Sequence, residues 1–80
     1  MNLTFFFAEF HGTHGFSARD LLFLGKHAFK QGLYNRAIEW FQASENTAMK
    51  EVNNTNLLEE IKPSLRAAIE VVSFMNKIKN

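Results

Sequence analysis

The chain is 80 residues long, carries a formal net charge of +1 and contains no cysteine. This length predicts one small domain. The near balance of nine Lys/Arg against eight Asp/Glu argues against a nucleic-acid partner, which would need a basic face. A hydrophobic content of 46% suffices for a packed core. The apolar stretch 3–10 is too short to span a bilayer and lacks the basic flank of a signal peptide, so we expect no membrane partner.

Residues 1–16 are predicted to form an N-terminal segment ahead of a helical domain at 17–80. The phenylalanine-rich part of this segment fits either a strand or a helical turn, because periodicity does not separate the two at this length. The glycine-containing stretch 11–15 is a break in the chain. His11 and His14 lack the further ligands that a zinc site needs, so we expect no metal and no other cofactor.

The first helix is predicted near 17–31. Ser17 and Asp20 have the spacing of a capping box, and Gly32 suits the left-handed conformation that ends a helix. One face carries small or apolar residues at helical spacing: Leu21, Leu24, Gly25 and Ala28. Glycine inside a helix costs about 1 kcal/mol relative to alanine, so we expect that Gly25 lets a second helix approach closely.

The second helix is predicted near 35–50. Its inward face is expected to consist of Tyr34, Ala37, Ile38 and Phe41, and a neighbouring face of Trp40, Ser44 and Ala48. Tyr34 and Trp40 are expected to pack between helices with their polar tips near water. The alternative is that the two rings form a stacking platform for proline.

A third helix is predicted near 57–79, after a loop at 52–56. Asn56 and Glu59 resemble a cap signal, and Pro63 either kinks this helix or marks its first turn. A broad apolar surface follows, made of Leu65, Ala68, Ile69, Val72, Phe74, Met75 and Ile78. On a domain with one helical pair, such a surface predicts self-association at high concentration.

The stretch 17–44 resembles one helix–turn–helix unit of the tetratricopeptide-repeat type. The signature of that family is W-x₂-L-G-x₂-Y followed by A-x₃-F. The residues that stand at these places, in order, are Leu21, Leu24, Gly25, Ala28, Ala37 and Phe41. The resemblance implies an all-α scaffold that binds an extended peptide. No second copy of the pattern occurs, so we expect the third helix to cover the apolar face of the unit.

The same stretch also resembles the peptide-substrate-binding domain of collagen prolyl 4-hydroxylase alpha subunits. The residues that carry this resemblance are Ser17, Ala18, Arg19, Asp20, Leu24, Gly25, Lys26, Ala28, Phe29, Tyr34 and Trp40. The family implies a groove for proline-rich peptide and a location in the endoplasmic-reticulum lumen. The chain departs from the family at Leu21, where a cysteine is usual, and in a third helix without tyrosine. Only the scaffold residues Leu24, Gly25, Tyr34 and Trp40 carry over.

A stripe on the first helix is the predicted peptide-binding surface, and it consists of Arg19, Leu22, Lys26, Phe29 and Lys30. The stripe is expected to lie away from the packing face, with three cations around an apolar floor. Such a surface suits an acidic peptide or a C-terminal carboxylate. The alternative is an ordinary solvated helix face whose lysines extend along apolar surface.

Catalysis is not expected. The sequence contains no nucleophile elbow, P-loop or dinucleotide-binding motif, and no His-x-Asp iron motif of the dioxygenase family. Glu59 and Glu60 are adjacent, and a helix directs them about 100° apart. The sequence therefore favours a non-catalytic peptide-binding module. Two alternatives remain open: a generic cytoplasmic repeat adaptor for protein–protein contact, and a structural fragment that self-associates.

Overall fold

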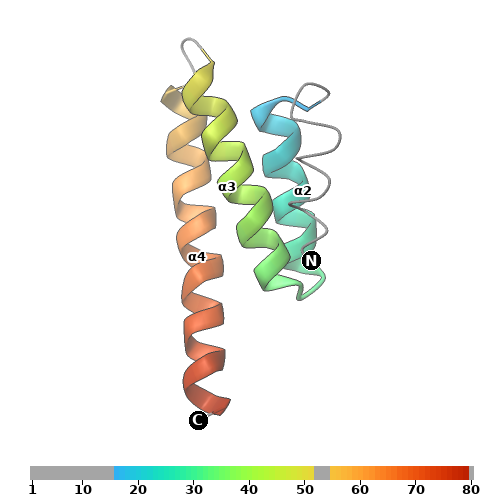
Figure 1. Cartoon of the computed structure of the whole chain (residues 1–80), viewed down its shortest axis with the longest axis vertical. Helices are drawn as coiled ribbons and strands as arrows, with labels where there is room; N and C mark the ends of the chain where they lie inside the picture. The colour runs from blue at the N-terminus through green and yellow to red at the C-terminus, as the bar shows by residue number, and fades with distance from the viewer. Residues whose placement is uncertain (1–15, 52–54, 80) are drawn as a thin grey trace.

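Three α-helices make up the part of the chain that the structure, a computed structural model, describes, residues 16–51 and 55–79. They are α2 (Ala18–Lys30), α3 (Tyr34–Lys50) and α4 (Thr55–Lys79). Figure 1 shows that α2 and α3 form an antiparallel pair and that α4 packs along α3. The predicted all-α fold, a helix–turn–helix unit with a third packed helix, is confirmed. The predictions for residues 1–15 and 52–54 lie outside the described residues.

The first turn of α2 is held by hydrogen bonds within the turn and by one hydrogen bond from α3. The backbone N–H of Asp20 donates to Ser17 Oγ at 3.1 Å, and the backbone N–H of Ser17 donates to Asp20 Oδ2 at 3.2 Å, which is the predicted capping box. Ser44 of α3 is fully buried, and its Oγ donates to the Ala18 carbonyl at 2.6 Å. A buried hydroxyl needs such a partner, so this bond also ties the two helices together.

The turn between α2 and α3 depends on Gly32, which has φ +81°. Its N–H donates to the Phe29 carbonyl, and the N–H of Leu33 donates to the Ala28 carbonyl, both at 3.0 Å. These two bonds define a Schellman motif, which satisfies carbonyls at the end of the helix. The prediction that Gly32 ends this helix in a left-handed conformation is confirmed.

The start of α4 differs from the prediction. The helix begins at Thr55, so Asn56 lies inside it and is not its cap. Pro63 also lies inside the helix rather than at its first turn. Proline has no N–H, so the Glu59 carbonyl loses its helical donor. Glu59 and Pro63 are both exposed, and the helix tolerates the loss because water reaches that side.

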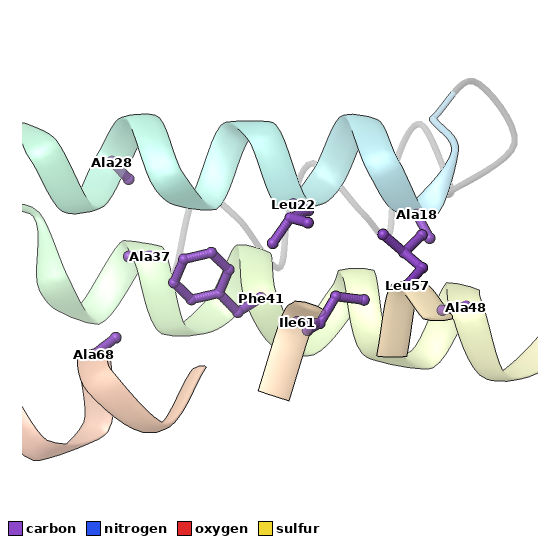
Figure 2. Packing of buried hydrophobic residues seen from close by; sticks show 9 residues of the cluster. All are labelled: Ala18, Leu22, Ala28, Ala37, Phe41, Ala48, Leu57, Ile61 and Ala68. Atoms are coloured by element: carbon purple, nitrogen blue, oxygen red, sulfur yellow. The ribbon is translucent and has the colours of Figure 1, made fainter. Parts of the chain in front are cut away.

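Alanine dominates the core, which lies between the three helices (Figure 2). The buried cluster consists of Ala18, Leu22, Ala28, Ala37, Phe41, Ala48, Leu57, Ile61 and Ala68. Phe41 is only 1% exposed, and a Cβ added at Gly25 would overlap with its ring. Gly25 therefore lets α2 and α3 approach closely, as predicted from the sequence. Small side chains at most core positions bring the helix axes near to each other.

Gly25→Ala is expected to destabilise the fold by about 1–3 kcal/mol, because the new methyl group overlaps with the Phe41 ring. Helix propensity alone would give the opposite sign, a stabilisation of about 1 kcal/mol. Urea unfolding measures the difference. Combining Gly25→Ala with Phe41→Leu should cost less than the sum of the single changes. A Gly25→Ala variant more stable than the parent would show that the contact does not exist.

Gly32→Ala is expected to destabilise the fold by about 1–2 kcal/mol, because an L-residue resists a positive φ. A Cβ at Gly32 would meet no heavy atom of the described residues within 4 Å apart from those of its two chain neighbours, so the substitution causes no clash. The loss of stability comes from the positive φ alone. Gly32→Asn should cost less, since asparagine tolerates the left-handed region. Thermal melts of the two variants check the order, and equal melting of Gly32→Ala and the parent would contradict it.

Candidate peptide-binding groove

A hollow of about 200 Å³ lies between α2 and α4. On the α2 side Lys26, Phe29 and Lys30 line it, and on the α4 side Ser64 and Ala67 do. The ring of the core phenylalanine of α3 forms part of its lining. The hollow exists because α2 and α4 each pack mainly on α3 and contact each other little. Most of its lining is apolar, and no carboxylate lines it.

A second hollow, of about 270 Å³, continues along the same side toward the start of α2. It is lined by Arg19, Leu22, Phe23, Lys26 and Glu60. Because Lys26 borders both hollows, the two form one surface, which we call the α2–α4 groove. The groove follows α2 from Arg19 to Lys30.

The structure brings four of the five predicted binding residues to this groove as accessible side chains. Arg19, Lys26 and Lys30 are exposed, and Phe29 is half-buried. Leu22 is the exception: it is 2% exposed and belongs to the core cluster. Its predicted place on a stripe away from the packing face is wrong, because α2 packs against both α3 and α4 and therefore buries a wider face.

Three scaffold residues of α2 lie as predicted, and one does not. Leu21, Gly25 and Ala28 are buried, as are Ala37 and Phe41 of α3. Leu24 is only half-buried, since the buried face of α2 is rotated toward Leu22.

Tyr34 and Trp40 pack against the helices rather than line the groove. Tyr34 is half-buried and meets Phe29 edge-to-face, with ring centroids 5.1 Å apart and an interplanar angle of 76°. Trp40 is half-buried against the core cluster. The prediction that both rings pack between helices is confirmed. Neither ring belongs to the residues that line the two hollows.

Positive charges lie along the α2 wall of the groove, at Arg19, Lys26 and Lys30. Arg19 Nη2 lies 3.5 Å from Glu60 Oε2, which partly balances the guanidinium charge. Both side chains are exposed, so this ion pair contributes little to stability. Lys26 and Lys30 lie one turn apart on the same face of α2, beside the hollow without a carboxylate. The groove therefore combines an apolar floor with two ammonium groups at its wall. Among the described residues neither lysine forms an ion pair, although Glu60 shares the second hollow with Lys26.

The α4 side of the groove could not be predicted from the first-helix pattern. Glu60, Ser64 and Ala67 recur at spacings of four and three residues, so they share one face of a helix. That spacing was available in the sequence. Which helix the face would meet depends on the packing of α4 against α3, and no local pattern contains that information.

Within 16–51 and 55–79, no three His, Cys, Asp or Glu residues group closely enough to hold a metal ion. No helix of these residues is long and apolar enough to cross a membrane. His11 and His14 lie outside the described residues.

Comparison of the chain with protein-family models, with curated proteins and with solved structures gives no match. The resemblance to tetratricopeptide repeats and to the prolyl 4-hydroxylase domain therefore stays a hypothesis that rests on the sequence motifs alone.

Proposed function

We propose that the chain is a non-catalytic peptide-binding module that holds an extended peptide in the α2–α4 groove. The observation that carries the proposal is the pairing of an apolar hollow with Lys26 and Lys30 at its wall. Peptide-binding grooves commonly combine apolar pockets for side chains with a few charged groups that fix orientation. The tetratricopeptide resemblance supports the same place, because the first helix of each unit lines the binding surface in that architecture.

The groove has the length of a short peptide. From Arg19 to Lys30, α2 extends for roughly 17 Å at 1.5 Å per residue. An extended strand rises about 3.3 Å per residue, so about five peptide residues fit beside it. A hollow of about 200 Å³ takes one apolar side chain of medium size.

Charge favours an acidic ligand over a proline-rich one. Lys26 and Lys30 attract a carboxylate placed next to an apolar anchor, whether from a side chain or from a C-terminus. Recognition of polyproline relies instead on aromatic walls. The α4 wall of the first hollow presents Ser64 and Ala67 and has no ring. The rings of the groove are phenylalanines of the other two helices, Phe29 and Phe41 in the first hollow and Phe23 in the second.

The prolyl 4-hydroxylase resemblance supports the competing ligand, a proline-rich peptide, and with it the endoplasmic-reticulum lumen. A generic tetratricopeptide adaptor in the cytoplasm is the other candidate. The two differ in ligand preference and in salt dependence, which makes them separable by one set of binding measurements.

Lys26→Glu and Lys30→Glu are each expected to weaken binding of an acidic peptide with one leucine by about tenfold, because each reverses a charge beside the groove. Titration calorimetry at two salt concentrations measures the effect, and binding should weaken as salt rises. Lys62→Glu is the matched control, since this exposed lysine of α4 lines a different hollow.

Two results would contradict the acidic preference. Tight binding of a (Pro-Pro-Gly) peptide with little salt dependence would favour the prolyl 4-hydroxylase resemblance instead. Equal loss of binding in Lys62→Glu and Lys26→Glu would show that net charge, and not the groove, governs affinity. If neither peptide binds, the peptide-binding proposal is wrong.

A further inference from the structure

The C-terminal part of α4 extends past the end of the α2–α3 pair (Figure 1). Large apolar side chains are exposed there: Phe74 at 63%, Met75 at 46% and Ile78 at 67%. Exposed apolar side chains that gather on one short helical segment mark an interaction surface. This surface lies beyond the stretch of α4 that contributes Leu57, Ile61 and Ala68 to the core.

Four apolar residues in the C-terminal half of α4 follow a regular spacing. Ala67, Val71, Phe74 and Ile78 are separated by four, three and four residues, so they form one stripe along α4. This is the spacing of the contact positions in a coiled coil. Glu70 and Lys77 each stand one residue away from a stripe position, and both border the same edge of the stripe. We call the four apolar residues the α4 stripe.

We propose that the α4 stripe binds the α4 stripe of a second copy of the chain, with the two helices antiparallel. In this pairing Phe74 packs against the partner's Val71, and Ile78 packs against the partner's Ala67. The same register places Glu70 beside the partner's Lys77. Two-fold symmetry repeats every contact, so both ends of the interface gain an ion pair.

The charges select both the partner and the direction. Glu70 and Lys77 have opposite signs and lie on opposite sides of the midpoint of the stripe, so the surface is complementary to itself. In a parallel pair the flanking positions would bring Glu70 to the partner's Met75, and no ion pair would form. A surface that complements its own copy fits an isologous dimer better than an unrelated protein.

The dimer is weak, because two short helical segments bury less than a standard interface. We expect a dissociation constant on the order of 10–1000 µM. The proposal does not depend on peptide binding, but the two surfaces adjoin, because Ala67 belongs to the stripe and lines the same hollow as Lys26 and Lys30. The partner's Ile78 therefore lies at the edge of the groove.

Sedimentation of the intact chain from micromolar to millimolar concentration tests the proposal. The parent is expected to form a dimer, and Phe74→Ser is expected to raise the dissociation constant by at least about tenfold. Phe23→Ser is the matched control, because Phe23 of α2 is 69% exposed and lies outside the stripe. It should leave dimerisation unchanged. Far-UV circular dichroism of both variants checks that each keeps its helical fold.

The proposal is overturned by a parent that stays monomeric at millimolar concentration, by assemblies larger than a dimer, or by equal effects of Phe74→Ser and Phe23→Ser. A charge exchange tests the direction. Glu70→Lys and Lys77→Glu should each weaken the dimer by about fivefold, and the double variant should restore it. A double variant as weak as the single variants would rule out the antiparallel register.

Discussion

The ring of Phe41 packs against the bare backbone of Gly25, and the spacing of α2 and α3 depends on this contact. Any side chain at Gly25 would move the ring, and the ring lies at the centre of the core between all three helices (Figure 2). The same ring lines the hollow between α2 and α4. The glycine thereby sets the position of α2 on α3, and the phenylalanine links that position to the shape of the groove.

Alanine at so many core positions makes the contact more important. Rows of alanines bring helices close but are nearly equivalent to one another, so a shift by one turn would pack almost as well. The alignment of α2 along α3 must therefore be set by contacts that form in only one arrangement of the two helices. The Phe41 ring fits only at the glycine, and the hydrogen bond from Ser44 to the Ala18 carbonyl forms only in one alignment. A small domain gains little free energy from burial, so specific pairs of this kind matter for a single native arrangement.

Sequence and structure agree where the signal is local. Helix positions follow from periodicity, and the capping box at Ser17 and the left-handed Gly32 follow from short-range chemistry. They disagree where the result depends on a second element. Leu22 is buried because α4 also covers α2, and the α4 wall of the groove exists only through packing on α3. The helix α4 begins at Thr55, two residues before the predicted start, so Asn56 lies inside the helix and is not its cap, and Pro63 lies in the helix interior on an exposed side.

Pro63 has a mechanical consequence for α4. The helix lacks one backbone hydrogen bond next to it, at the Glu59 carbonyl. Leu57 and Ile61 anchor the helix in the core before this point and Ala68 anchors it after this point, and the helix then continues to the exposed Phe74. Bending stiffness of a helix comes from its hydrogen-bond ladder, so α4 is most compliant near Pro63. A change of helix angle at Pro63 would therefore move Ala68 in the core together with the exposed end of α4, so the packing of one alanine limits how far that end can swing.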